Sequence, residues 1–201
     1  MIQLFMKRSG SPVIVPLNLP ASHDAMTEAA SQLDEASRAG KTEIVEIKSV
    51  IANLPSYLGG LDPDSRTQLA QLNRLASIIA KMDSRERDIY AGALDGNSIN
   101  DLNDMIRVAE QVSDYILIPN VNSDVTLGRY VAVAGQIQGD PRFPEAVWPY
   151  LDFAKIGAEY YAEHGGAYCL RRAVQHGSVQ KIRSHQRCHH DRPGLQHRLL
   201  P

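Results

Sequence analysis

The fold is decided by the stretch that begins LAQLNRLASIIAKM (residues 69–82), continues DSRERDIYAGAL (residues 83–94) and reaches SINDLNDMIRVAEQV (residues 98–112). Apolar residues recur here every three or four positions, which places them on one face of an α-helix. Asp83 followed by Glu86 is typical of a capping box at a helix start. The sequence therefore predicts helices joined by short turns, which form a compact helical module over residues 61–113.

The segment before this helical stretch has a different pattern. Residues 2–6 (IQLFM) and 13–19 (VIVPLNL) are short apolar runs separated by Ser-Gly-Ser-Pro, which favours two strands joined by a loop. A helix is predicted over residues 22–38, and residues 43–51 (EIVEIKSVI) indicate a third strand or an extended segment. We therefore predict a small α/β module over residues 1–60.

The segment after the helical stretch again mixes strand and helix signals. Residues 114–118 (DYILI) predict a strand, Ser123 is a suitable N-cap for a following helix, and residues 152–164 predict a last helix. These elements define a further α+β module over residues 114–169. The fold class expected for the whole chain is α+β, with three small modules in a row.

The charge of the chain is unevenly distributed. Residues 1–170 carry 22 Asp and Glu against 14 Lys and Arg, a net charge of −8, whereas residues 171–201 carry a net charge of +6. Residues 170–201 show no helical or strand period, so we expect a basic, unstructured tail. Three interpretations of the tail are open: a nucleic-acid-binding segment, a disordered tail, or a frameshifted or chimeric end that is not native. The abrupt loss of pattern favours the last.

Several classes of function find no support in the residues. The chain lacks Gly-rich phosphate loops and a GxSxG nucleophile motif, so we predict no catalytic residues, no cofactor and no enzyme activity. Cys169 has no close ligand partner, which favours adventitious metal capture over a folded zinc site. The chain has no run of 18 apolar residues and its start lacks a secretory pattern. With only two cysteines, we expect a cytoplasmic protein without membrane contact.

The remaining candidate site is a set of carboxylates. Three interpretations apply: a solvated surface, acid–base catalysis, or an acidic surface that binds a basic partner protein. No His, Lys or aromatic cluster accompanies the acids, so the acidic surface is preferred to catalysis. The candidate partner-binding residues are Asp83, Glu86, Asp88, Asp95, Asp101, Asp104, Glu110, Asp114, Asp152, Glu159 and Glu163.

Six segments, taken in order, resemble the ArdA family of antirestriction proteins from conjugative elements. The resemblance covers about residues 1–168, and no segment is specific by itself. The segments are residues 69–82, residues 83–94, residues 98–104 (SINDLND), residues 115–119 (YILIP), residues 127–130 (LGRY) and residues 149–168 (PYLDFAKIGAEYYAEHGGAY).

The resemblance implies an elongated, three-module homodimer that mimics bent B-form DNA. Members of this family occupy the DNA-binding groove of type I restriction–modification enzymes, and the body is not expected to bind nucleic acid itself. The alternative function is an acidic regulatory or scaffold module of a mobile element that binds another basic protein. Carried over by position, the mimicking charges would be Asp83, Glu86, Asp88, Asp101, Asp104, Asp152, Glu159 and Glu163.

Overall fold

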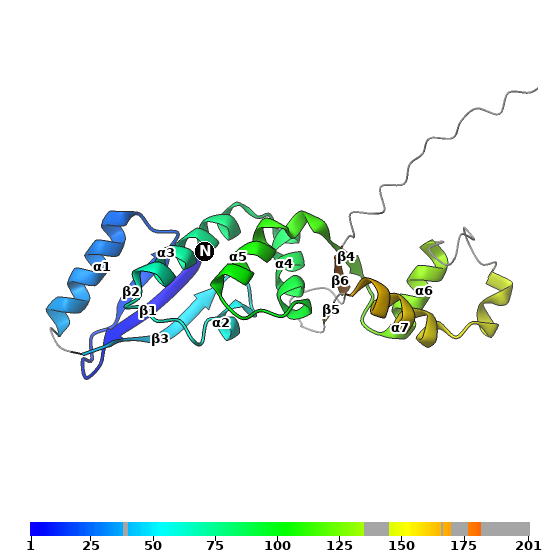
Figure 1. Ribbon diagram of the computed structural model, residues 1–201, viewed down its shortest axis with the longest axis horizontal. Helices are drawn as coiled ribbons and strands as arrows, with labels where there is room; N and C mark the ends of the chain where they lie inside the picture. Colours follow the sequence, from blue (N-terminus) through cyan, green and yellow to red (C-terminus); the bar gives the residue numbers. More distant parts are fainter. Residues whose placement is uncertain (38–39, 135–144, 166, 170–176, 182–201) are drawn as a thin grey trace, which may run out of the picture.

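The chain has a mixed α+β structure, as the fold-class prediction requires. The computed structural model describes residues 1–37, 40–134, 145–165, 167–169 and 177–181. The molecule is elongated, with one antiparallel sheet and its helices at one end and a second sheet with further helices toward the other (Figure 1). Within the described residues, no helix is long and apolar enough to cross a membrane.

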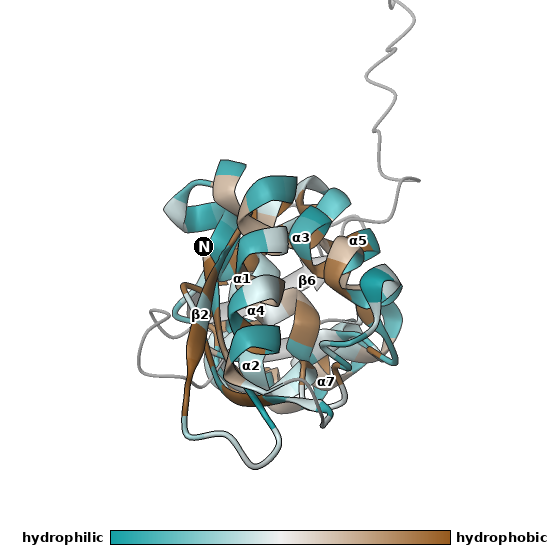
Figure 2. Cartoon of the chain, turned by 90° about the vertical axis from the view of Figure 1, so that its left-hand side faces the viewer, coloured by the Kyte–Doolittle hydropathy of each residue, from teal (hydrophilic) through white to brown (hydrophobic). Residues whose placement is uncertain are grey.

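The first sheet is antiparallel and has the strand order β2-β1-β3. Ile2, Leu4 and Met6 of the central strand are buried, because alternate side chains of a strand point to the same face. In the end-on view the strongly hydrophobic strands lie on one side of the helices, whose outer surfaces are largely hydrophilic (Figure 2). The strands are β1 (Ile2–Arg8), β2 (Val15–Leu19) and β3 (Thr42–Ser49).

Side-chain caps begin the principal helices of this end of the molecule. The Ser22 hydroxyl accepts a hydrogen bond from the Ala25 N–H at 3.2 Å, and the capping box predicted at Asp83 and Glu86 is present. Before α3 the cap is Ser65, whose hydroxyl accepts from the backbone N–H of the third helical residue. The helices are α1 (His23–Ala36), α2 (Leu54–Tyr57), α3 (Arg66–Lys81), α4 (Ser84–Gly96) and α5 (Leu102–Glu110).

One hydrophobic cluster joins the first sheet to these helices. It runs from Ile2 to Tyr115 and includes Leu54, Leu58 and Leu75. The cluster therefore crosses the boundary near residue 60 between the first two predicted modules. Leu58, just before that boundary, is only 3% exposed, so this segment packs on the core. We call residues 1–115 the N-terminal unit.

A second hydrophobic cluster lies beyond it, around Ile118, Val121, Leu127 and Val131. We call residues 116–181 the C-terminal unit. Its sheet has the order β4-β6-β5 and packs against α4. The short helix η1 (Val112–Asp114) leads into this unit. The elements that follow it are β4 (Tyr115–Pro119), α6 (Asp124–Ala134), η2 (Glu145–Tyr150), α7 (Phe153–His164), β5 (Ala167–Cys169) and β6 (Gly177–Lys181).

The prediction of an unstructured tail over residues 170–201 is wrong for residues 177–181. These residues form β6, the central strand of the second sheet, which pairs with β4 on one side and β5 on the other. The sequence pattern missed this strand because backbone pairing with two neighbours needs no alternation of polar and apolar side chains. Residues 170–176 and 182–201, and with them all of the tail's arginines and histidines, lie outside the described residues.

Helices α6 and α7 approach each other at two glycines. A Cβ atom placed on Gly128 would lie 2.0 Å from the carbonyl oxygen of Phe153, and one on Gly157 would lie 1.9 Å from that of Asp124. Real side chains do not tolerate such distances to backbone atoms. Gly128 and Gly157 are therefore required for the helix crossing that forms the C-terminal unit.

Candidate acidic surface

Asp83 and Glu86 hold the start of α4. The Asp83 Oδ1 atom accepts a hydrogen bond from the Glu86 backbone N–H at 2.8 Å, and Glu86 Oε2 accepts one from the Asp83 N–H at 2.9 Å. Asp83 is exposed and Glu86 is half-buried. Both carboxylates therefore have a structural role while they still present charge to solvent.

Asp101 and Asp104 form a similar arrangement at the start of α5. Asp101 Oδ1 accepts from the Asp104 backbone N–H at 2.9 Å. Asp104 Oδ2 accepts from the Asn100 backbone N–H at 3.0 Å, and its Oδ1 lies 2.8 Å from Arg107 Nη2. The Asn100 backbone N–H, with the Asn100 side-chain amide and the Arg107 charge, lowers the pKa of Asp104. The Asp104 carboxylate is therefore held ionised in a fixed orientation.

Asp95 and Glu110 connect elements rather than cap them. Asp95 Oδ1 accepts from the amide of the buried Asn53 at 2.9 Å and from the hydroxyl of Tyr57 at 2.8 Å, which ties α4 to α2. Glu110 Oε1 lies 2.6 Å from Arg74 Nη2 and forms an exposed ion pair between α5 and α3. Part of the charge of Glu110 is thus offset by a neighbouring cation.

Asp88 and Asp114 differ in their surroundings. Asp88 on α4 is half-buried, and the loss of solvation raises the pKa of its carboxyl group. Asp114 lies exposed in η1, at the point where the N-terminal unit gives way to β4. Of these two carboxylates, that of Asp114 is the more exposed to a partner.

The other candidates lie on or next to α7, in the C-terminal unit. Asp152 caps this helix, because its Oδ1 accepts from the Lys155 backbone N–H at 3.0 Å. Glu159 lies one turn after Lys155 and its Oε1 is 4.0 Å from the Lys155 Nζ. Glu163 is exposed in the last turn. The C-terminal unit therefore carries its own group of acids, separate from that on α4 and α5.

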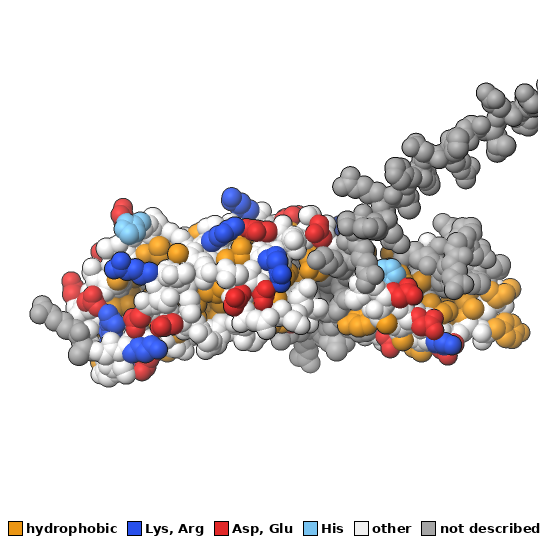
Figure 3. Space-filling model, in the orientation of Figure 1, with side chains coloured by type: hydrophobic (Ala, Val, Ile, Leu, Met, Phe, Trp, Pro, Cys, Tyr) orange, Lys and Arg blue, Asp and Glu red, His pale blue; other side chains and the backbone are white. Residues whose placement is uncertain are grey.

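The candidate acids do not form one cluster. They occur in two groups along the long axis, one on α4, α5 and η1 and one on α7. On the face shown in Figure 3, acidic side chains are spread along the length of the molecule, and basic side chains lie among them over the N-terminal unit. The capping box predicted at Asp83 and Glu86 is confirmed, whereas the ion pairs of Glu110, Asp104 and Glu159 with Arg74, Arg107 and Lys155 depend on the fold.

An ionic cluster that the sequence interpretation missed lies beside β3. The Asp64 carboxylate accepts hydrogen bonds from the Thr42 backbone N–H at 2.9 Å and from the Thr42 hydroxyl, and Arg8 bridges Asp64 to Asp34 of α1. Partial burial opposes ionisation, but the two Thr42 hydrogen bonds and the charges of Arg8 and Lys41 lower the pKa of Asp64 overall. No local signal predicts this cluster, because its members are far apart in sequence.

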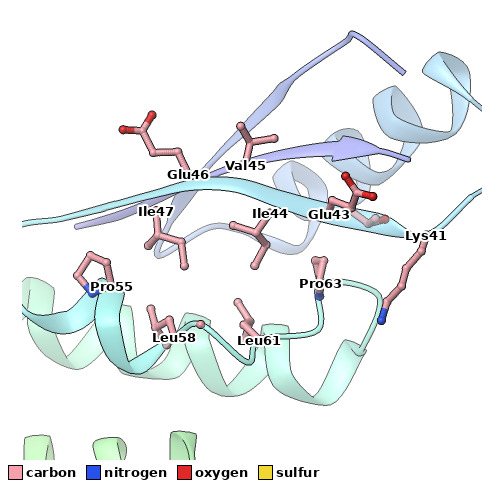
Figure 4. Close-up of a pocket in the computed structure, with 12 residues that line it drawn as sticks. Lys41, Glu43, Ile44, Val45, Glu46, Ile47, Pro55, Leu58, Leu61 and Pro63 are labelled. Carbon is pink, nitrogen blue, oxygen red and sulfur yellow. The ribbon is translucent and has the colours of Figure 1, made fainter. Parts of the chain in front are cut away.

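A groove beside β3 was also missed. It has a volume of about 490 Å³ and lies between the strand and the segment from α2 to Pro63. Ile44 and Ile47 point from the strand toward Leu58 and Leu61 across it (Figure 4). The pattern of residues 43–51 predicted a strand, but whether a strand lies at a sheet edge depends on the pairing of the whole sheet.

The acidic side chains do not form a metal site. Within the described ranges, no group of three or more His, Cys, Asp or Glu residues is arranged to hold a metal ion. No protein-family model matches the chain, and no curated protein is significantly similar to it.

Proposed function

We propose that the chain is an antirestriction protein that mimics B-form DNA and inhibits type I restriction–modification enzymes by occupying their DNA-binding groove. The observation that carries the proposal is the placement of exposed carboxylates (Figure 3) along an elongated body (Figure 1) whose residues 1–170 carry a net charge of −8. Duplex DNA presents a regular row of negative charges along its axis, so a mimic needs charge distributed along its length. The resemblance to ArdA proteins supports the same conclusion.

The proposal has finer parts that go with it. The chain would act in the cytoplasm as a homodimer, without enzymatic activity, and its body would bind the restriction enzyme rather than DNA. The three modules of the proposal would be the first sheet, the helices α3–α5 and the C-terminal unit. The first two of these modules share one hydrophobic cluster, and the third has its own. A shared core favours a rigid body, which keeps the spacing between charges constant.

Helix capping makes the proposed charges well suited to mimicry. Asp83, Asp101 and Asp152 each accept a backbone N–H at a helix start, which fixes the orientation of the carboxylate. A charge that is already ordered loses little conformational entropy when it binds a cationic side chain. Phosphates of a duplex are fixed in the same sense, so capped carboxylates are better phosphate substitutes than acids on freely rotating side chains.

The neighbouring cations should weaken the mimicry. Arg107 and Lys155 lie within ion-pair distance of Asp104 and Glu159, and they reduce the negative potential on α5 and α7. If the protein binds as a DNA mimic, removal of these cations strengthens inhibition, whereas removal of the capped acids weakens it. The two kinds of variant should change the strength of inhibition in opposite directions. A general effect of mutation, such as partial unfolding, would weaken inhibition in both.

The test is a DNA-protection assay with a type I restriction enzyme and the full-length protein. The acid variant combines Asp83→Ser, Asp101→Ser and Asp152→Ser, because Ser is as good an N-cap as Asp but carries no charge. We expect the concentration for half-protection to rise about tenfold or more for this variant. The matched variant Arg107→Gln/Lys155→Gln should lower it.

Competition with DNA provides a second readout. Inhibition by a DNA mimic weakens as the concentration of substrate DNA rises, because both molecules compete for one groove. Full-length protein that gives no protection, or protection that is independent of DNA concentration, contradicts the proposal. Binding to another basic protein with no effect on restriction would instead support the scaffold function.

A further inference from the structure

A second cavity of the N-terminal unit lies between α3, the start of α5 and the segment that joins α2 to α3. Helices α3 and α5 pack against each other beside it (Figure 1). The cavity has a volume of about 300 Å³. Sites for small ligands span about 300–1,000 Å³, so this one is at the lower end of the range and has room for a single long side chain.

The lining of this cavity is divided between apolar and polar side chains. Leu58, Leu102 and Met105 are buried and belong to its apolar lining, together with the half-buried Leu61. The polar lining consists of Tyr57, Gln68, Gln71, Asn100, Asp101 and Asn103. Lysine and arginine side chains have the same division, because an aliphatic stem carries a charged end.

Hydrogen bonds hold the polar side chains of the cavity in place. Gln71 Nε2 donates to Asn103 Oδ1 at 2.7 Å and so links α3 to α5. Gln68 Oε1 accepts a backbone N–H from the segment before α3 at 2.7 Å, and the Tyr57 hydroxyl donates to Asp95 Oδ1 at 2.8 Å. Side chains that are already ordered lose little conformational entropy when a ligand binds. We therefore expect the cavity to be formed before it is occupied.

The charge at this cavity is negative. Among the described residues, Asp101 is the only charged residue that lines it, and Asp101 is exposed. Two further carboxylates, those of Asp95 and Asp104, accept hydrogen bonds from lining residues. The charges that oppose them are Arg107, which pairs with Asp104, and the partial charge of about +0.5 at the start of α5. Three carboxylates outweigh these two, so the cavity attracts a cation rather than an anion.

The donors of an arginine fit this lining better than those of a lysine. A guanidinium group presents five N–H donors in one plane and stacks on aromatic rings, whereas an ammonium group is a compact and strongly hydrated point charge. The acceptors at the cavity are distributed over a carboxylate and several amide side chains, and Tyr57 adds an aromatic ring to the lining. A flat group with several donors can therefore use more of the lining than a point charge.

We propose that this cavity receives one arginine side chain of the partner protein. The guanidinium group pairs with Asp101, and the aliphatic stem packs against Leu61, Leu102 and Met105 of the lining. Phosphate mimicry needs only exposed negative charge, whereas this contact needs an arginine at one position of the partner's surface. The cavity therefore allows the protein to select among proteins that have basic grooves.

The test is a titration of the full-length protein with N-acetyl-arginine amide, followed by the NMR signals of the side-chain amides that line the cavity. We expect saturable shifts of Gln68, Gln71 and Asn103 with a dissociation constant of about 1 mM, the scale for a ligand of this size. N-acetyl-citrulline amide has nearly the same shape without the charge and should bind about tenfold more weakly or worse. Equal binding of citrulline overturns the pairing with Asp101, and equal binding of N-acetyl-lysine amide overturns the choice of arginine.

Two variants separate the cavity from charge in general. Asp101→Asn removes the carboxylate and keeps the helix cap, because Asn and Asp are equally good N-caps, and it should weaken binding of the arginine probe about tenfold or more. Asp83→Asn makes the same change at the start of α4, outside the cavity, and should leave binding of this probe unchanged. Circular dichroism verifies that both are folded. A native chain without saturable shifts, or Asp101→Asn with the native affinity, overturns the inference.

The inference rests on the proposed function only for the source of the arginine, and the two can fail separately. In the DNA-protection assay, charge alone predicts equal losses for Asp83→Asn and Asp101→Asn, whereas the cavity predicts a larger loss for Asp101→Asn. Protection by a native chain that does not bind the arginine probe overturns the cavity and leaves the antirestriction function. Binding of the probe without protection contradicts the antirestriction function and leaves the cavity.

Discussion

Substitution of Gly157 by Ala tests the contact between α6 and α7. The added Cβ would lie 1.9 Å from the Asp124 carbonyl oxygen and 2.9 Å from the Gly128 backbone nitrogen. Both atoms belong to the backbone of α6, so no side-chain rotation can relieve the clash. The two helices must separate, and the second hydrophobic cluster around Leu127 and Val131 must open with them.

The magnitude follows from two opposing effects. Non-bonded atoms need about 3.5 Å, so the helices must separate by more than about 1 Å locally. Overpacking of this kind costs about 1–3 kcal/mol, and backbone clashes lie at the upper end. Ala in place of Gly within a helix returns about 1 kcal/mol. We therefore expect Gly157→Ala to lower the free energy of unfolding of the C-terminal unit by about 2 kcal/mol, up to about 30-fold in the equilibrium constant.

The assay is urea unfolding followed by tryptophan fluorescence. Trp148 is the only tryptophan of the chain, and its ring lies edge-on to Phe153 of α7 with centroids 6.3 Å apart. Its emission therefore reports on the C-terminal unit. Hydrogen exchange of the α6 and α7 amides gives an independent readout, and protection should fall in both helices.

Gly59→Ala is the matched control. A Cβ on Gly59 meets no atom within 4 Å, so the same chemical change should leave stability unchanged or slightly increased. If Gly157→Ala changed the unfolding free energy by no more than this control, the steric argument for the helix crossing would be refuted.

Three further predictions concern other parts of the structure. Because the folded-state pKa of Asp64 is lowered, its carboxylate stabilises the fold above the unfolded pKa of about 3.9 and this contribution is lost as pH falls through the lower, folded value. Asp64→Asn should therefore unfold about 1 kcal/mol more easily at pH 7 after allowance for solvent screening, with a difference that shrinks below about pH 4 in acid titrations of stability. Asp83→Ala should lower thermal stability by about 1 kcal/mol while Asp83→Ser should not, since only Ser can cap α4; equal losses would contradict the capping role. Deletion of residues 170–201 removes β6 from between β4 and β5, and hydrogen-exchange protection of β4 should fall; unchanged protection would show that β6 does not support the sheet.

Local interactions explain most of what could be predicted from the sequence. The capping box of α4 joins Asp83 and Glu86, which are three residues apart, and the cap of α5 joins Asp101 and Asp104 in the same way. Such contacts form within one helical turn, so residue types and spacing are enough to predict them. The same reasoning could not identify which of the candidate acids would be paired with cations.

Long-range pairing accounts for what could not be predicted. Both partners of β6 precede it in the chain: β5 is separated from it by residues 170–176, and β4 by α6, η2, α7 and β5 as well. The sequence of β6, GSVQK, has no clear strand pattern. Arg8, Asp34 and Asp64 likewise meet only because β1, α1 and the segment before α3 pack together.

The sequence by itself determined the longer helices, the capping box of α4, the first two strands and the acidity of the body, because each depends on residues close together in the chain. Only the tertiary structure decided that β3 is an open edge beside a groove, that one core joins residues 1–115, and that β6 completes the second sheet. These features depend on which backbone groups find partners across the chain, and sequence spacing carries no information about that choice.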